Sequence, residues 1–226
     1  MKDGGREGKF HEALLSGAGH MGLDISPDAA RRLVEHWRLL VRWNRKVNLT
    51  AVTDPLLAAE ALYLDSAVVV RWLAAGRTVH DVGSGAGFPG LVIKAMCPET
   101  EVRLTEARRR KVSFLRRAAS SMDLLPGLVI ECRRLGWPRN RPALAGEVLS
   151  RATFPPREWM RQGAGLVEPE GRLWLYLGHH LADEGRTDEH VPEAPEGFVL
   201  ERRHHYRLPF SDRRRTLVSY RRVTGG

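Results

Sequence analysis

The chain has 226 residues, of which 42% are hydrophobic and 28% are charged, and this composition excludes collagen, coiled-coil and wholly disordered proteins. The length suits one domain, or one domain with an appended subdomain, and no run approaches about 18 consecutive apolar residues. The net charge of +9 favours a polyanionic partner, with nucleic acid first and an anionic membrane second.

The first third of the chain is predicted to be helical after a loose start. Residues 1–25 are rich in glycine and show little periodicity, so we expect a flexible N-terminal segment. Ser26 and Pro27 are typical of a helix N-cap and of the first helical position, and apolar residues then recur at helical spacing. A second helix is expected over residues 56–75. Residues 26–76 are therefore predicted to form a helical subdomain.

From residue 77 to residue 226 the pattern predicts a second, larger domain in which strands and helices alternate. This spacing is typical of βαβ units and predicts an α/β fold with a mostly parallel sheet covered by helices. Two β-rich runs near the C-terminus, joined by turn residues, indicate an antiparallel hairpin. The expected strands are 78–82, 101–105, 128–132, 147–150, 172–177, 198–208 and 216–223, and the expected helices are 91–96, 108–122 and 156–167.

A glycine-rich turn follows the first expected strand, with the sequence DVGSGAGFPG from Asp81 to Gly90. Glycines at such a position let the backbone turn tightly and approach a ligand without Cβ clashes. An acid followed by alternating glycines is typical of S-adenosylmethionine-dependent methyltransferases, where the acid faces the cationic methionine end of the cofactor. Glu106 ends the next strand, where a carboxylate can accept hydrogen bonds from both ribose hydroxyls.

Two other interpretations of this turn are open. The run from Gly85 to Gly90 also matches the G-x-G-x-x-G pattern of dinucleotide binding, although it begins one glycine late and Pro89 removes an N–H. The turn could also pack a strand against a helix without any ligand. The terminal hairpin favours the methyltransferase, because the last strand of that sheet is inserted antiparallel.

Five further segments of the chain contain short motifs. They are WNRKVNLTAVTDP at 43–55, LDS at 64–66, KVSFLR at 111–116, SRA at 150–152 and RTLV at 215–218. Together with the glycine turn they resemble the bacterial GidB family, methyltransferases that act on N7 of a guanine in small-subunit (16S) ribosomal RNA. The resemblance covers roughly residues 33–223. It implies a Rossmann-like class I methyltransferase fold with a seven-stranded sheet, and S-adenosyl-L-methionine as cofactor.

The resemblance also implies the residues of the site. Guanine N7 has a free lone pair, so methylation needs no general base and positioning supplies most of the rate. Asn48 and Thr50 would face the cleft, although a helix-capping turn is the alternative for both. The implied catalytic residues are Arg151 and Asn48. The implied cofactor-binding residues are Asp81, Gly83, Ser84, Gly85, Gly87, Phe88, Glu106, Ala107, Arg134, Leu135 and Arg151, with core packing as the alternative for Phe88 and a surface position for Arg151.

The chain departs from the family pattern at three places. Leu62 stands where the family has His, Leu177 where it has Lys, and Arg134-Leu135 where it has a small or apolar residue and Glu. Two other functions therefore remain open: a methyltransferase of another RNA site or a small molecule, and a non-catalytic RNA-binding protein with this fold. The intact glycine turn with its acids argues against the second.

Basic clusters indicate where RNA would bind. We predict phosphate contacts for Arg213, Arg214, Arg215, Arg109, Arg110 and Lys111, with a solvated basic face as the alternative. The pairs His179-His180 and His204-His205 lack the spacing of metal ligands, so we expect no metal.

The compartment follows from what the sequence lacks. The first residues do not have the pattern of a secretory signal, and two cysteines are too few for a disulfide framework or a four-cysteine zinc site. We expect a cytoplasmic monomer that acts on 16S rRNA or the 30S subunit, with no membrane contact.

Overall fold

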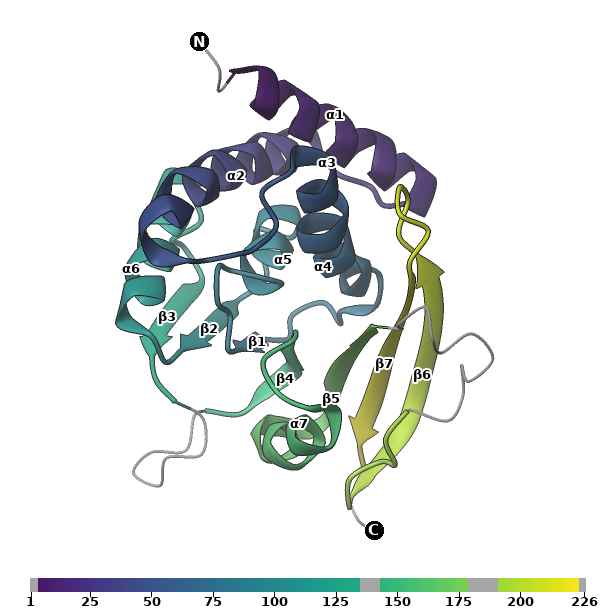
Figure 1. The fold of residues 1–226 in the computed structure, drawn as a ribbon. Coiled ribbons are helices and arrows are strands. Elements are labelled where there is room, and N and C mark those ends of the chain that lie inside the picture. Colours follow the sequence, from purple (N-terminus) through teal and green to yellow (C-terminus); the bar gives the residue numbers. More distant parts are fainter. Residues whose placement is uncertain (1–3, 135–142, 179–190, 224–226) are drawn as a thin grey trace.

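The computed structural model describes residues 4–134, 143–178 and 191–223, and its centre is one seven-stranded sheet in the order β3-β2-β1-β4-β5-β7-β6 (Figure 1). Strands β1 to β5 pair in parallel, and β7 pairs antiparallel with both β5 and β6. The mostly parallel sheet and the terminal hairpin are therefore confirmed. The strands are β1 (Val79–Val82), β2 (Val102–Glu106), β3 (Leu128–Cys132), β4 (Ala145–Ser150), β5 (Val167–Gly178), β6 (Phe198–Arg207) and β7 (Arg214–Arg222).

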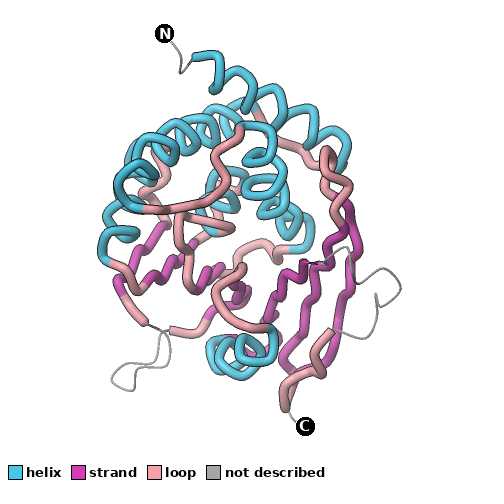
Figure 2. Tube along the Cα trace, in the orientation of Figure 1, coloured by secondary structure: helices cyan, strands magenta, loops and turns pink. Residues whose placement is uncertain are grey.

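Helices cover both faces of this sheet and bury a separate core on each (Figure 2). The larger core includes Trp174 and Leu217 and takes in the helices of the first third of the chain; the smaller one includes Leu173 and Val218 and is covered by α7. The helices are α1 (Gly4–Met21), α2 (Pro27–Val47), α3 (Pro55–Ala58), α4 (Asp65–Ala67), α5 (Gly90–Met96), α6 (Arg109–Ser121) and α7 (Pro156–Gly163). Within the described ranges, no helix is both long enough and apolar enough to cross a membrane.

The N-terminal segment differs from the expectation of a loose chain, because it contains α1. Phe10 and Leu14, four residues apart, are fully buried, and the Phe10 ring stacks on Trp37 with centroids 5.1 Å apart. A Cβ at Gly5 or Gly8 would meet no atom within 4 Å. These glycines therefore lie on the open side of the helix and leave its apolar side intact.

Helix α2 begins where the sequence predicts, with the Ser26 hydroxyl accepting the Ala29 N–H at 3.2 Å. The residues of α2 share one core with the sheet, so no break in packing separates residues 26–76 from the rest. The proposed boundary at residue 76 stays a prediction.

The second expected helix, over 56–75, is helical only to Trp72 and changes type along its length. A π-helix (η1, Ala59–Leu64) and a 3₁₀ turn (η2, Val68–Trp72) flank α4. In η1 the Asp65 N–H donates to the Glu60 carbonyl, five residues back, which brings these two buried acids one above the other. Glu60 accepts the N–H groups of Phe210 and Ser211 at 2.9 and 3.1 Å. The π-helix therefore aims two carboxylates at the C-terminal part of the chain.

Candidate functional site

A pocket of about 530 Å³ lies at the carboxyl ends of β1, β2, β3 and β4. This edge is where doubly wound α/β sheets bind ligands, because the loops that follow the parallel strands converge there. The predicted cofactor residues that line it are Gly83, Glu106, Ala107 and Arg134. Leu135, also predicted, is outside the described residues.

The glycine turn forms one wall of the pocket, and its glycines have different roles. A Cβ at Gly83 would lie 2.4 Å from the Thr153 side chain, and one at Gly87 would lie 2.6 Å from Leu91. Both glycines have positive φ, so they are needed for close packing in a left-handed conformation. Gly85, with φ +58°, is different: a Cβ there would have no neighbour closer than 3.8 Å. Close packing therefore does not require a glycine at position 85, in contrast to positions 83 and 87.

The Glu106 carboxylate is fixed at the end of β2 beside Gly85. Its Oε2 accepts the Gly85 N–H at 3.1 Å and its Oε1 accepts the Arg108 N–H at 2.7 Å. A carboxylate has about four lone-pair positions, so two remain for a ligand. The arrangement holds Glu106 in place and leaves it able to accept hydrogen bonds from hydroxyl groups in the pocket.

Asp81 is fully buried under the same turn. Its Oδ2 accepts the Gly90 N–H at 2.9 Å, whereas its Oδ1 has no partner in the described part of the chain. Burial raises the pKa of Asp81 to about 7, although hydrogen bonds from Gly90 and Ser84 and the charge of Arg151 lower it. The Ser84 hydroxyl also donates to the Asp81 carbonyl at 3.0 Å and is buried, so Ser84 supports the turn from inside.

Arg151 follows β4 but is not among the residues that line the pocket; Ala152 and Thr153 after it are. Its Nη1 lies 3.0 Å from Asp65 Oδ2 and donates to the Ala61 carbonyl at 2.8 Å. Its guanidinium lies 5.4 Å from the centroid of the Phe88 ring. Arg151 is therefore held in one place at the border between the sheet and the N-terminal helices.

Asp65 is the centre of this contact, and the sequence alone predicted no role for it. The Tyr206 hydroxyl donates to Asp65 Oδ1 at 2.7 Å, and the Arg215 Nε lies 3.7 Å from the same oxygen. These partners are 86 to 150 residues away in the sequence. The LDS motif was the one local signal that could have pointed to it.

Phe88 packs in the core rather than in the pocket. Its ring meets the edges of His36 and Tyr63, with centroids 5.2 and 4.9 Å away, and it is not among the pocket residues. This geometry matches the alternative of core packing, and a contact with a cofactor stays a prediction.

His36 joins α2 to the glycine turn. Its Nε2 lies 2.9 Å from the Ala86 carbonyl oxygen, which can only accept, so Nε2 carries the proton and the Tyr63 hydroxyl donates to Nδ1 at 2.7 Å. Burial lowers the pKa of His36 to about 4, and the ring is neutral at physiological pH. The neutral imidazole therefore fixes the position of the turn without adding a charge.

The loop after α2 is organised by Asn44. Its Oδ1 accepts the N–H groups of Leu49 and Thr50 at 2.7 and 2.9 Å, and its Nδ2 donates to the Thr50 carbonyl. Asn48 is the left-handed C-cap of α2, with φ +50° and an exposed side chain. This agrees with the capping alternative, and catalytic roles for Asn48 and Thr50 stay predictions.

The residues predicted to bind RNA fall into two kinds. Arg109 and Arg110 begin α6 and are exposed, as are Arg213 and Arg214. Lys111 instead lines the pocket, near Gly85, and Arg215 is partly buried beside Asp65. The RNA contacts of all six residues stay predictions.

The described residues contain no cluster of His, Cys, Asp or Glu that could hold a metal ion. His204 packs against Trp72 and Tyr206, and His205 Nδ1 lies 2.9 Å from the Thr216 hydroxyl. His179 and His180 are outside the residues that the structure describes.

Comparison with known proteins gives one family. The model of GidB, "rRNA small subunit methyltransferase G", matches residues 29–207. A "Ribosomal RNA small subunit methyltransferase G" of Anaeromyxobacter sp. (strain Fw109-5) is 35% identical over 95% of this chain and 99% of its own length. The protein of that name from Myxococcus xanthus is 33% identical over 94% and 97%.

Solved structures agree on the fold. A SAM-dependent methyltransferase from Aquifex aeolicus has a TM-score of 0.53 at 15% identity and covers 74% of this chain and 93% of its own. TrmN from Thermus thermophilus also has a TM-score of 0.53, at 17% identity, and covers 80% of this chain and 52% of its own. At such identities the likeness supports the class I methyltransferase fold and nothing finer.

Proposed function

Because the chain belongs to the GidB family of rRNA small subunit methyltransferases, we propose that it transfers a methyl group from S-adenosylmethionine to N7 of a guanine in 16S rRNA. The observation that carries the proposal is the pocket at the carboxyl ends of β1 to β4, which the Glu106 carboxylate lines while it accepts the N–H of Gly85 in the glycine turn.

The residues of the pocket fit the parts of this cofactor. Glu106 would accept the ribose hydroxyls, and Gly85 would allow the chain of the cofactor to pass close to the backbone. Asp81 lies beneath the turn with one unpaired oxygen, and a cationic group nearby would favour its charged form. When bound, S-adenosylmethionine supplies an electrophilic methyl group on sulfur.

The protein's part in the reaction is positioning. Guanine N7 attacks with its own lone pair, so the chain has no proton to remove, and the rate depends on holding N7 in line with the methyl group and excluding water. Arg151, fixed by Asp65 and lying against Phe88, would orient the base. Arg109, Arg110, Arg213 and Arg214 are exposed cations that would contact RNA phosphates.

The test is methyl transfer from labelled cofactor to purified 16S rRNA and to assembled 30S subunits, followed by mapping of the modified nucleotide. We expect label at N7 of one guanine, and loss of label with Gly85→Leu. Label on a different atom, or transfer only to a small molecule, would overturn the proposal while leaving the family intact. Comparing the two substrates shows which one the enzyme uses.

A further inference from the structure

A second hollow, of about 380 Å³, lies between α1 and α2 and shares no residue with the pocket at the sheet edge. Its walls carry four arginines: Arg6 of α1 and Arg38, Arg42 and Arg45 of α2. Trp37, Val41 and one acid, Glu7, complete the lining. The hollow therefore has a strong excess of positive charge.

The arginines differ in how far their charge is already compensated. Arg38 makes two hydrogen bonds to Glu35, both at 2.8 Å, and Arg6 donates to the Thr53 carbonyl. Arg42 and Arg45 are exposed, and within the described ranges neither has a hydrogen-bond or ion-pair partner. Two guanidinium groups are therefore available to an anion from outside.

The spacing of the arginines suits a chain of phosphates. Residues 38, 42 and 45 are i, i+4 and i+7 on one face of a helix, a span of about 10 Å at about 1.5 Å per residue. A strand of B-form DNA presents a phosphate every ~3.4 Å of helix axis, and an A-form RNA strand is spaced more closely, so more than one RNA phosphate falls within this span. Trp37 is almost fully buried and offers no face on which a base could stack.

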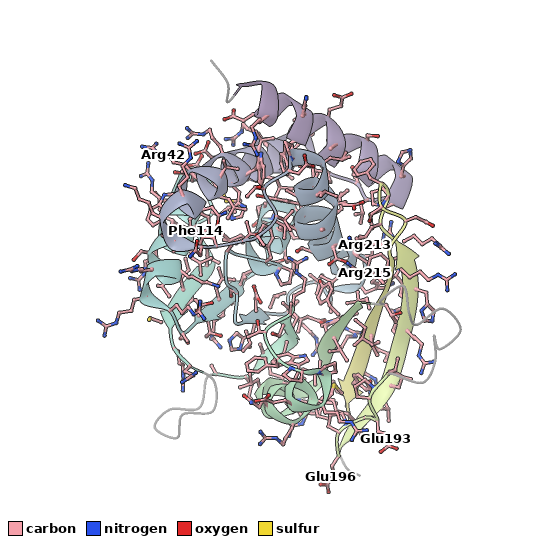
Figure 3. The ribbon with its side chains drawn as sticks, viewed as in Figure 1. Arg42, Phe114, Glu193, Glu196, Arg213 and Arg215 are labelled. Carbon is pink, nitrogen blue, oxygen red and sulfur yellow. The ribbon has the colours of Figure 1, made fainter. Side chains whose placement is uncertain are left out.

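Helix α2, which carries three arginines of the hollow, packs against α6, which carries basic residues next to the pocket. Trp43 of α2 packs against Phe114 of α6 with centroids 5.7 Å apart, and α6 begins with Arg109 and Arg110 next to Lys111 of the pocket. Figure 3 shows Arg42 and Phe114 at one side of the molecule, whereas Glu193 and Glu196 lie at the opposite end. An extended anion could follow α6 and α2 away from the pocket.

We propose that the hollow between α1 and α2 binds the phosphate backbone of the substrate RNA, at a distance from the methylated base. The proposal rests on the proposed function, since it names where the same RNA is held. Arginine forms bidentate, charge-assisted bonds with phosphate, and contacts to phosphate carry no sequence information. The contact should therefore add affinity without sequence preference.

The test is the double variant Arg42→Ala/Arg45→Ala, with Arg157→Ala/Arg161→Ala as matched control. The control removes two exposed arginines from α7, which covers the other face of the sheet. Binding of a 16S rRNA fragment, measured across salt concentrations, should weaken about tenfold at low salt. The log–log salt slope should fall by about 1.4–1.8, or roughly 0.7–0.9 for each lost phosphate contact. An unrelated RNA of equal length should lose as much, and KM should rise while kcat stays the same.

The lysine variant Arg42→Lys/Arg45→Lys separates charge from packing and should keep most of the affinity and of the slope. A salt slope equal to that of the control would overturn the inference and leave the hollow to another partner, such as an acidic protein segment. Methyl transfer by the unmodified chain tests the proposed function on its own. Normal methyl transfer by the unmodified chain, together with an unchanged salt slope in the alanine variant, would therefore refute RNA binding at the hollow and leave the proposed function intact.

Discussion

Two buried acids on neighbouring strands, Glu147 of β4 and Asp81 of β1, have opposite environments. Glu147, near the amino ends of the strands, accepts the Ala74 N–H at 3.1 Å, the Arg172 guanidinium at 3.0 Å and the Trp174 indole N–H at 2.6 Å. Asp81, near the carboxyl ends, has one oxygen bound to the Gly90 N–H and one without a partner. Burial raises the pKa of both carboxyls.

The difference indicates that the two ends of the sheet have different roles. At the amino ends, Arg172 also binds Glu201, and Arg221 lies near Glu201 and Glu170, so the polar groups satisfy one another. At the carboxyl ends, Asp81 Oδ1 has no partner in the described part of the chain, Gly85 has no close neighbour, and Glu106 has lone pairs that accept no hydrogen bond. We infer that the first edge stabilises the fold and the second is reserved for a ligand.

The largest expected effect is on stability and concerns Glu147 at the amino ends of the strands. Glu147→Ala leaves the buried Trp174 indole N–H without an acceptor and removes one partner of Arg172, so we expect a loss of about 3 kcal/mol in the free energy of unfolding. Glu147→Gln keeps an acceptor and should lose less. Urea denaturation measures both, and a loss in the alanine variant below about 1 kcal/mol would contradict the assignment of a stabilising role.

The next effect concerns cofactor binding at the carboxyl ends of the strands. Gly85→Leu should weaken S-adenosylmethionine binding more than about 100-fold, or about 2.7 kcal/mol, because the side chain fills the space above the turn. Gly85→Ala is the control, since both variants share the strain of a left-handed residue, about 1–2 kcal/mol, but only leucine occupies the pocket. Calorimetry showing equal affinities for the two variants would place the cofactor elsewhere.

Glu106 tests the same edge with a smaller change. Removing the carboxylate in Glu106→Ala costs charge-assisted hydrogen bonds worth ~1.5–3 kcal/mol, so affinity for the cofactor should fall roughly 10- to 100-fold. Glu106→Gln, which keeps an acceptor, should lie between the alanine variant and the unmodified chain. An unchanged dissociation constant for the alanine variant would remove Glu106 from the site.

The smallest expected effect is the pH dependence that Asp81 gives to the free energy of unfolding. The folded chain holds the Asp81 proton up to a pKa of about 7, whereas the ordinary value is 3.8, so rising pH removes stability as the native carboxyl ionises. Between pH 6 and 8 the loss from this group is about 1.4 kcal/mol, the value of one pKa unit. Asp81→Asn should lack that slope in urea titrations at the two pH values. A variant with the same slope as the unmodified chain would refute the assignment.

Local signals predicted much of the fold. Ser26 and Pro27 fixed the start of α2, the bounds of β3 agree with the expected strand 128–132, and the alternation of strands and helices yielded the parallel sheet. The helix α1 was not predicted, because its glycines hide the spacing of Phe10 and Leu14. The π-helix was not predicted either, since Glu60 and Asp65 point to partners about 140 to 150 residues away.

The sequence predicted the positions of candidate site residues on the backbone better than the directions of their side chains, and their roles stay predictions. The glycine turn and Glu106 lie at strand ends, which alternation alone can place, and both line or border the pocket. Phe88, Lys111 and Arg215 each turn to a neighbour that a linear sequence does not reveal: the aromatic core, the pocket and Asp65.

The position of β7 has a consequence for the assembly of the sheet. β7 follows β6 in the described part of the chain, yet it lies between β5 and β6, and a Cβ at Gly17 of α1 would lie 3.1 Å from Pro209 in the turn before it. Until residues 214–222 pair with both neighbours, the facing edges of β5 and β6 are unpaired, and unpaired edges are where chains associate wrongly with one another. Insertion of β7 therefore removes two of these unpaired edges in one step and leaves β3 and β6 as the outer strands of the sheet.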